Sequence, residues 1–338
     1  MEKRQVKLTP AADSCAIYSK EMVFQHSFAD EPLKTSRLRS FRAEHFPSSG
    51  PYPWLDADDA LDQISARLQR QEMSEHEAEL CRQWRADGYV ILPNLIENAV
   101  LDRVWAAYEE AISGGRIALL PEPAGADDPY PGRFLNPHKK IGAFCQILKH
   151  PQLLRLMTVL LGREPRPLQT IAGHKGSQQG LHSDSIHMTT YPLGYLLAAW
   201  VAFEDIDADS GPLVYYPGSH RLPYVFSKDV GITEEAFRRE GYASYHAKYE
   251  PFIRGLVERH ELRAHHFHAR KGDVLIWHAN LIHGGSGRRN LELSRRAVVC
   301  HFYAKNAFVY HDLAAARSKQ QYLGTCLLRD QSGKIRLL

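Results

Sequence analysis

From residue 167 to residue 304 the sequence consists of short β-rich runs separated by glycine, proline and aspartate turns, and this pattern restricts the fold more than any other feature. Many short strands with such punctuation are typical of a sandwich or a barrel. The apolar run "LLAAWVAF", residues 196–203, predicts a strand buried on both faces. We expect strands near 167–173, 186–190, 196–204, 213–216, 264–269, 273–278, 281–283 and 296–304.

Helical patterns precede these strands and interrupt them once. Ser74 and Glu77 form a capping box, which predicts a helix that begins at Ser74 and ends at Gly88. A short strand over 89–96 and helices over 98–112 and 150–162 follow. The interval 226–262 has a helical pattern again, and a long insertion in a compact domain is often functional. We therefore expect this insertion to act as a lid.

Composition and charge limit the class of protein. The chain has 338 residues, of which 44% are hydrophobic and 24% charged, as in ordinary globular proteins. A net charge of +3 is too small to indicate a nucleic-acid partner. No apolar run approaches the roughly 20 residues that span a bilayer. The five scattered cysteines, without a CxxC pair, and the lack of an apolar leader predict reduced thiols and a cytoplasmic location.

These patterns predict one domain with extensions at both ends. Residues 1–70 read as an irregular extension packed on or near the core. Residues 71–310 read as a single domain, with a helical buttress over 71–165 and a β-rich part over 166–305 that contains the insertion. Residues 311–338 read as a tail. The sequence does not predict an oligomeric state.

The stretch "LHSDS" contains the first candidate for chemistry. In an extended strand His182 and Asp184 would point to the same face. The alternative is a surface histidine next to a turn aspartate. A third ligand is expected from "DVLIWHANLIHGGSG", which offers His278 and His283. His283 stands at the end of an apolar run, before two glycines that permit close approach. Two histidines and one carboxylate form the facial triad of non-haem Fe(II) oxygenases, which leaves positions for an oxo-acid and O₂.

An oxo-acid needs a fixed cation for its distant carboxylate. Arginine suits this role because its planar fork pairs with a carboxylate through two hydrogen bonds. "LSRRAVVCHF" offers Arg295 and Arg296, whose side chains alternate along the chain. One should face inward and the other outward, unless both are solvated.

Several motifs in order carry a family resemblance: "HSD", "DSGPLVYYPGSHRLP", "KGDVLIWHANLIHGGSG" and "SRRAVVCHFY". Over roughly residues 75–310 the chain resembles the phytanoyl-CoA dioxygenase family of Fe(II)/2-oxoglutarate oxygenases. The resemblance implies a mainly β fold with flanking helices, whose core is a double-stranded β-helix, or cupin-like jelly-roll.

The resemblance also implies roles for individual residues. His182, Asp184 and His283 match the iron ligands, and Arg295 matches the residue that holds the C5 carboxylate of 2-oxoglutarate. The sequence "HGGSG" has one glycine more than the commoner family pattern, which leaves the choice between Arg295 and Arg296 open. Three further residues match positions that contact or line the cosubstrate site in relatives: Gln169, Trp200 and Ser286.

The implied reaction is hydroxylation of an unactivated C–H bond with Fe(II), 2-oxoglutarate and O₂, and with release of succinate and CO₂. Halogenases of this superfamily lose the carboxylate ligand, and this chain keeps Asp184. Two alternatives stay open. The chain could be a non-catalytic jelly-roll that binds a metal or a ligand, or the same core could catalyse desaturation or cyclisation.

The substrate is expected to be a small or medium-sized, anionic metabolite. Residues 251–300 contain nine lysines or arginines against four acidic residues, although these side chains could simply be solvated. His187 and Arg221 are candidates for substrate contact, and His220 is a weaker one. The stretch "HHFH", residues 265–268, could mimic a second metal site, but its expected place beside the metal strands argues against that.

Overall fold

The computed structural model describes residues 40–46, 52–119, 132–317, 327–329 and 335–337. The helices are α1 (Ala60–Gln69), α2 (Glu75–Asp87), α3 (Asn98–Ser113), α4 (Cys145–Leu148), α5 (Pro151–Leu161), α6 (Glu234–Glu240) and α7 (Tyr242–Arg259). The strands are β1 (Ser40–Phe41), β2 (Tyr89–Leu92), β3 (Arg133–Leu135), β4 (Pro165–Gly173), β5 (Thr189–Tyr191), β6 (Leu196–Ala202), β7 (Leu213–Tyr215), β8 (His265–Phe267), β9 (Val274–His278), β10 (His283–Gly285), β11 (Ala297–Ala304), β12 (Phe308–Tyr310), β13 (Ala316–Arg317), β14 (Leu327–Arg329) and β15 (Ile335–Leu337).

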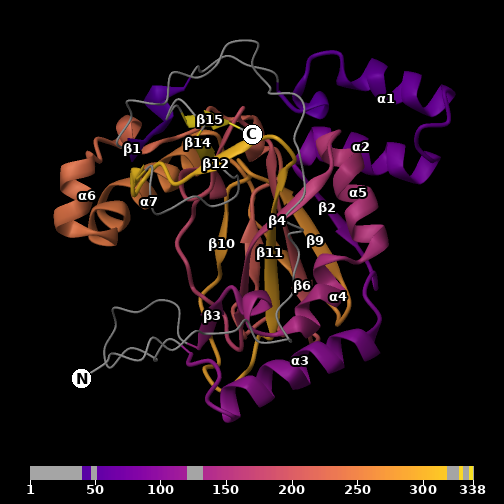
Figure 1. Cartoon of the computed structure of the whole chain (residues 1–338), viewed down its shortest axis with the longest axis vertical. Coiled ribbons are helices and arrows are strands. Elements are labelled where there is room, and N and C mark those ends of the chain that lie inside the picture. The colour runs from indigo at the N-terminus through magenta and orange to yellow at the C-terminus, as the bar shows by residue number, and fades with distance from the viewer. Residues whose placement is uncertain (1–39, 47–51, 120–131, 318–326, 330–334, 338) are drawn as a thin grey trace.

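Two antiparallel sheets form the core (Figure 1). The large sheet has the strand order β2-β9-β6-β11-β4-β3, and the small sheet has the order β10-β7-β8. From β4 to β11 the chain passes back and forth between the large sheet and the small-sheet side, and only β7 and β8 follow each other within the small sheet. This is the path of a double-stranded β-helix. β5 pairs with β12 instead of joining the small sheet. The remaining strands form two further pairs, β1 with β13 and β14 with β15.

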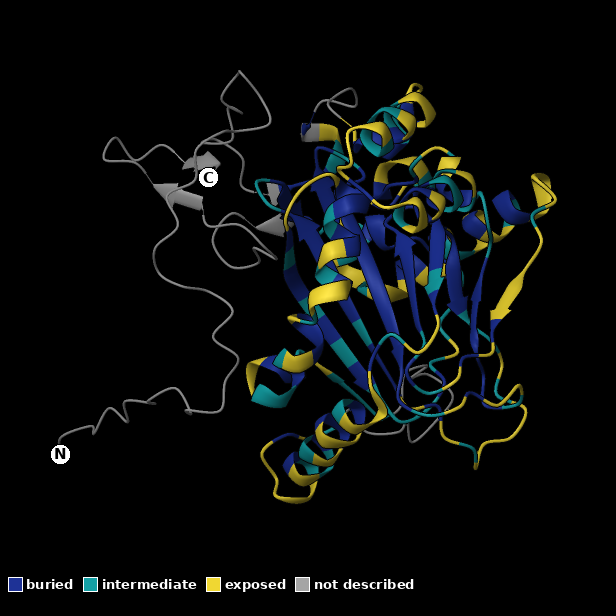
Figure 2. Ribbon diagram, turned by 90° about the vertical axis from the view of Figure 1, so that its right-hand side faces the viewer, coloured by how far each residue is buried: buried dark blue, intermediate teal, exposed yellow. Residues whose placement is uncertain are grey.

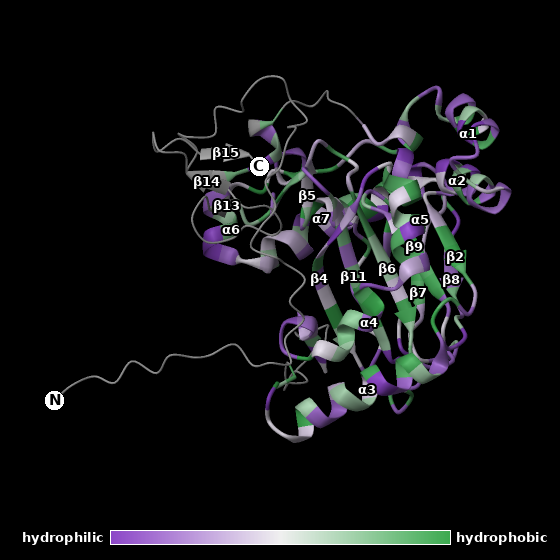
Figure 3. Cartoon of the chain, turned by 45° about the vertical axis from the view of Figure 1, so that its right-hand side comes forward, coloured by the Kyte–Doolittle hydropathy of each residue, from purple (hydrophilic) through white to green (hydrophobic). Residues whose placement is uncertain are grey.

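Strand β6 shows why the large sheet is apolar on both faces. All seven of its residues are buried, as the run "LLAAWVAF" predicts. Leu197, Ala199 and Val201 face the helices, whereas Trp200 packs against Phe267 of β8 between the two sheets. The helices α1 to α5 pack on the outer face of the large sheet. Figure 2 shows the strands of this sheet as buried, and Figure 3 shows that they are largely apolar.

The helix α2 begins and ends as its sequence predicts. The Ser74 hydroxyl accepts a hydrogen bond from the Glu77 backbone N–H, and the Glu77 carboxylate accepts one from the Ser74 backbone N–H. Gly88 ends the helix with a φ of 78°, in the left-handed region that favours glycine. β2 follows directly and pairs with β9, so α2 is fixed against the edge of the large sheet.

The insertion over 226–262 forms the two helices α6 and α7, at one end of the core (Figure 1). The buried side of α7 packs on Ile186 and Ile282, which lie next to the candidate ligands Asp184 and His283 in the sequence. Residues 40–46 lie against the same end of the core, where the ring of Phe46 stacks on Tyr310. The prediction of an irregular chain up to residue 70 is wrong over Ala60–Gln69, which forms α1. Only Ala60 and Ile64 of this helix are fully buried, so its apolar signal in the sequence is small.

Two other sequence-based expectations can be compared with the structure. Cys81 and Cys300 are free and buried, but Cys145 is disulfide-bonded, so the expectation of reduced thiols is wrong at this position. Over the described part of the chain, every helix is too short or too polar to cross a membrane.

Candidate metal and cosubstrate site

The backbone fixes the relative positions of the two candidate histidine ligands. His182 and His283 face each other in a single β-bridge, where each backbone N–H donates to the carbonyl of the other residue at 2.9 Å. The same residue, His283, begins β10 and pairs with Tyr215 of β7. Residues 101 positions apart in the sequence are therefore held side by side by main-chain hydrogen bonds, independently of any metal.

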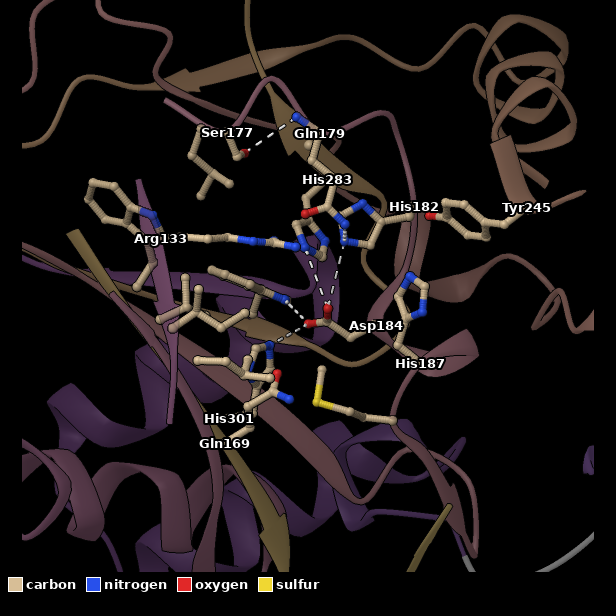
Figure 4. A pocket seen from close by; sticks show the side chains of 18 of the residues that line it. Arg133, Gln169, Ser177, Gln179, His182, Asp184, His187, Tyr245, His283 and His301 are labelled. Carbon is tan, nitrogen blue, oxygen red and sulfur yellow. Dashed lines mark hydrogen bonds and ion pairs between the residues drawn. The ribbon is translucent and has the colours of Figure 1, made fainter. Parts of the chain in front are cut away.

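Asp184 completes the group, but not through an extended strand. It begins a short 3₁₀ helix, Asp184–Ile186, so the expectation that His182 and Asp184 share one face of a strand is wrong. The turn brings the carboxylate to the imidazoles by another route. Asp184 Oδ1 lies 3.9 Å from His182 Nε2 and 3.7 Å from His283 Nε2. One ligand atom from each residue falls within 4.8 Å of the others, and all three residues are buried (Figure 4).

Hydrogen bonds orient both imidazoles. His182 Nδ1 donates to the Gly180 carbonyl at 2.9 Å, and His283 Nδ1 donates to the Leu281 carbonyl at 2.9 Å. Each Nδ1 therefore carries the proton, and each Nε2 keeps its lone pair toward the centre of the group. This is the usual arrangement of metal-binding histidines, whose second nitrogen is tied to the protein.

Burial favours the neutral form of the imidazoles, and the imidazoles around Asp184 favour the ionised form of its carboxyl group. Burial and the neighbouring His283 lower the pKa of His182 to about 3. Burial likewise lowers the pKa of His283. For Asp184 burial opposes ionisation, but the imidazoles of His283, His301 and His182 outweigh it and hold the pKa below its ordinary value. Neutral imidazole and ionised carboxylate are the forms that bind a divalent metal.

The two glycines after His283 allow the loop before His182 to lie directly on β10. A Cβ at Gly284 would stand 2.8 Å from the Gln179 carbonyl oxygen, and one at Gly285 would stand 2.7 Å from the Gln178 nitrogen. The Gly285 N–H also donates to the Gln179 carbonyl at 2.9 Å. The additional glycine of "HGGSG" thus has a physical reason, since any side chain there would displace the loop that carries His182.

The triad opens into a cavity of about 510 Å³ between the two sheets. Its walls come from the strands of the large sheet, from the loop before His182, from β10 and from α7. The lining residues are Arg133, Leu135, Gln169, Ile171, Ser177, Gln179, His182, Asp184, His187, Met188, Trp200, Leu213, Tyr242, Tyr245, His246, Trp277, His283, Gly284, Arg295, Val299, His301 and His311.

The two candidate arginines point to opposite sides of the sheet. Arg295 is buried, lines the cavity, and lies with its guanidinium carbon 5.7 Å from the ring centre of Trp200. Its Nη1 donates to the Gly211 carbonyl at 3.1 Å, while its buried Nε has no partner among the described residues. Arg296 is half-exposed and faces Glu204, with Nε 3.6 Å from Oε2. Of the two candidates, only Arg295 lines the cavity.

The other predicted residues divide into those inside the cavity and those outside it. Gln169, Trp200 and His187 line it. Ser286 and Arg221 are not among the lining residues. Ser286 directly follows β10, and its N–H donates to the Pro212 carbonyl. Arg221 donates to the Ala86 carbonyl at the end of α2, at 2.8 Å.

The other histidines that the sequence analysis considered lie away from the site. His278 Nε2 lies 3.2 Å from the carboxylate of Asp56, and its Nδ1 accepts from the Asn280 N–H, so it joins segments structurally. His220 stacks near His278. His265, His266 and His268 are exposed on or next to β8, and the described residues contain no second group of three ligands.

Several cavity residues escaped the sequence analysis. Trp277 and His301 contact Asp184, and Tyr242, Tyr245 and His246 enter from α7. His301 had a usable signal, because Val299 and His301 follow Arg295 at even spacing and so share its face. The α7 residues had none, since their position depends on how the insertion folds back over the core.

The fold and the buried triad define a class: jelly-roll proteins with two histidines and one aspartate arranged to hold a metal. Comparison with known proteins then gives the family. The model of the family "Phytanoyl-CoA dioxygenase (PhyH)" matches residues 84–297, well over half of the chain, and the chain belongs to this family of Fe(II)/2-oxoglutarate oxygenases. The predicted family and the predicted jelly-roll fold are confirmed.

Individual relatives are distant. The chain is 26% identical to the peroxisomal phytanoyl-CoA dioxygenase of Mus musculus over 243 residues, which is 65% of this chain and 66% of that protein. It is 22% identical to the ectoine dioxygenase of Halomonas elongata, over 88% of this chain and 92% of that protein. The structure of EctD from S. alaskensis with 2-oxoglutarate and 5-hydroxyectoine aligns with a TM-score of 0.54 at 18% identity, over 74% of this chain and 86% of that one. The chain spans less than two thirds of the first curated relatives it matches.

Proposed function

We propose that this protein is an Fe(II)/2-oxoglutarate-dependent dioxygenase that hydroxylates an unactivated C–H bond of a small or medium-sized, anionic metabolite. Succinate and CO₂ are the co-products. One observation carries the proposal. Two neutral, oriented imidazoles and an ionised carboxylate converge in a buried cavity, and the same cavity is lined by a buried arginine that has no carboxylate partner among the described residues.

The donor set fits Fe(II). The Nε2 atoms of His182 and His283 and Oδ1 of Asp184 would hold the ion on one side, and the open side would face the cavity. Iron bound there supplies the binding of 2-oxoglutarate and O₂ and the oxidation of the substrate. The protein's part is to position both organic molecules and to exclude water from the site.

Arg295 suits the C5 carboxylate of 2-oxoglutarate. Burial, together with the nearby Arg288, lowers the pKa of Arg295 to about 10, so it is still a cation at neutral pH. A buried cation without an anionic partner is costly, and a carboxylate would relieve that cost. Trp200 covers one side of the guanidinium, and Gln169 lies on β4 nearby in the same cavity.

The evidence for an anionic substrate is the charged residues of the cavity wall, and no longer the count of basic residues in 251–300. Of the nine basic residues in 251–300, only Arg295 lines the cavity. Others are used elsewhere, such as Lys271 in an ion pair with Asp102 and Arg289 in one with Asp209. The cavity wall offers Arg133 as a second cation, and Asp184 is its only carboxylate among the described residues.

The decisive experiment has two stages. Anaerobic addition of Fe(II) and 2-oxoglutarate should give a weak metal-to-ligand charge-transfer band in the visible region, and His182→Ala should abolish it. A succinate-release screen over anionic metabolites then identifies the substrate. An unchanged band in His182→Ala would refute the site. A normal band with no succinate from any substrate class would favour a non-catalytic binding module.

Product analysis separates the remaining reaction types. Hydroxylation adds one oxygen atom to the substrate. Desaturation and ring closure each remove two hydrogen atoms and add no oxygen. Mass spectrometry of the product from ¹⁸O₂ reactions therefore distinguishes hydroxylation from the other two reactions. The cytoplasmic location stays a prediction from the sequence.

A further inference from the structure

The two oxygens of the Asp184 carboxylate face different partners. Oδ1 faces the His182 and His283 imidazoles, as described above. Oδ2 accepts a hydrogen bond from Trp277 Nε1 at 2.7 Å and lies 3.5 Å from His301 Nε2 (Figure 4). Protein contacts of this kind on the second oxygen favour binding of a metal through the first oxygen.

The two groups that hold Oδ2 come from rigid parts of the large sheet. Trp277 lies on β9 and His301 on β11, and these strands flank β6. Both side chains are almost fully buried, with 2% and 3% of their surface exposed. The histidines that face Oδ1 belong instead to the segments joined at β10. The carboxylate is therefore held from the large sheet, and the imidazoles from the small-sheet side.

His301 does not act as a structural histidine elsewhere in the core. Its Nδ1 is buried without a hydrogen-bond partner among the described residues, so its one polar contact is through Nε2 to Asp184. Its strand neighbours in register, Gln169 and Ala198, make no hydrogen bond to the ring. A buried imidazole nitrogen without a partner costs free energy, so the stability of the core alone does not explain His301.

We propose that His301 is a positioning residue: together with Trp277 it holds Oδ2 of Asp184, so that Asp184 binds the metal through Oδ1 alone. This inference rests on the proposed function, because it takes the triad as the metal site. Single-oxygen binding keeps one more metal position open on the cavity side. Outer hydrogen-bond partners of this kind change metal affinity by roughly 10- to 100-fold when they are removed.

The experiment uses Co(II) as a spectroscopic probe of the full-length protein, with calorimetry for affinity. His301→Leu removes the nitrogen and keeps the apolar bulk, and His301→Gln restores a donor at similar reach. We expect His301→Leu to bind Co(II) about 10-fold or more weakly and to show an altered ligand-field spectrum. His301→Gln should recover most of the affinity and the original spectrum.

His138→Leu is the matched control. His138 is also a buried imidazole, but its Nδ1 contacts the Thr170 hydroxyl and it lies outside the cavity. It should lose stability without any change in Co(II) affinity. Thermal melting without metal shows that each variant folds, and Trp277→Phe tests the same oxygen through its other partner if His301→Leu does not fold.

Each outcome has a defined meaning. Equal Co(II) affinity and spectra in wild type and His301→Leu would overturn the inference. Equal losses in His301→Leu and His301→Gln would also overturn it, because they would indicate packing instead of hydrogen bonding. If His182→Ala bound Co(II) as well as wild type, the proposed function itself would fail, and this separates the two ideas.

Discussion

The two ends of the cavity are built differently. One end, proposed to bind the oxo-acid and called the oxo-acid end, contains Arg295 and Trp200, which are buried on or next to the hydrogen-bonded strands of the large sheet. The other end, called the lid end, is formed by Tyr242, Tyr245 and His246 of α7, and 47% of the Tyr242 surface is exposed. The chemistry common to the family lies on rigid strands, where geometry is most precise. The end built from an inserted helix is where a particular substrate would be selected.

The largest expected effect is on the KM for 2-oxoglutarate, and it should distinguish Arg295 from Arg296. Arg295→Leu should raise the KM for 2-oxoglutarate roughly 30-fold, equivalent to about 2 kcal/mol, because the cosubstrate carboxylate would lose its buried cation. The measurement is the 2-oxoglutarate dependence of succinate release, with the charge-transfer band as an independent titration.

Arg296→Leu is the control for that variant. Arg296 is adjacent in sequence but faces Glu204 outside the cavity. Its removal should leave the KM for 2-oxoglutarate within about twofold of wild type, since exposed ion pairs contribute little. Similar losses in both variants would show that the oxo-acid end does not bind the cosubstrate through Arg295.

A second prediction concerns the lid end. Tyr242→Leu should raise the KM for the substrate roughly tenfold, about 1.4 kcal/mol, through loss of an aromatic contact and of the hydroxyl. The KM for 2-oxoglutarate should not change. Phe252→Leu is the matched control, because Phe252 is an exposed aromatic residue on the same helix that does not line the cavity. An effect of Tyr242→Leu on both KM values would contradict the division of the cavity into two ends.

The same contrast explains what the sequence could predict. The strands of the core followed from β-rich runs and turn residues, and the period of two predicted that one of Arg295 and Arg296 faces inward. His182, Asp184 and His283 were identified through ligand type and motif order. The local geometry at Asp184 was not, because an H-x-D spacing is compatible with both a strand and the 3₁₀ turn that the chain adopts.

The two predicted residues that do not line the cavity depend on loop paths. Ser286 and Arg221 follow turns whose direction is set by contacts with distant segments, such as the Pro212 and Ala86 carbonyls. Charge counting also misled, since most basic residues of 251–300 lie outside the cavity. A local sequence pattern contains no information on which side of a sheet a long loop returns.

The smallest effect concerns the pH dependence of the lid. Tyr242 at the start of α7 contacts His311, with Oη 3.3 Å from Nε2, and the Ala314 N–H donates to His311 Nδ1 at 3.1 Å. Burial lowers the pKa of His311 to about 4, although the neighbouring Asp312 opposes this. His187 also packs against the ring. His311 is therefore neutral when the lid is closed, and its Nδ1 cannot accept the Ala314 hydrogen bond once it is protonated.

The sign of the pH effect follows from linkage. An exposed histidine has a pKa of about 6.5, so acid favours the state in which His311 is exposed and protonated. The closed lid is fully stable above pH 6.5 and loses stability as the pH falls toward 4. Limited proteolysis within 226–262 should speed up about two- to threefold between pH 7.5 and about 6.2, and 2-oxoglutarate with substrate should protect. His311→Phe should weaken this pH dependence, whereas His260→Phe, at the exposed end of α7, should leave it unchanged. Equal pH dependence in wild type and His311→Phe would show that His311 does not hold the lid.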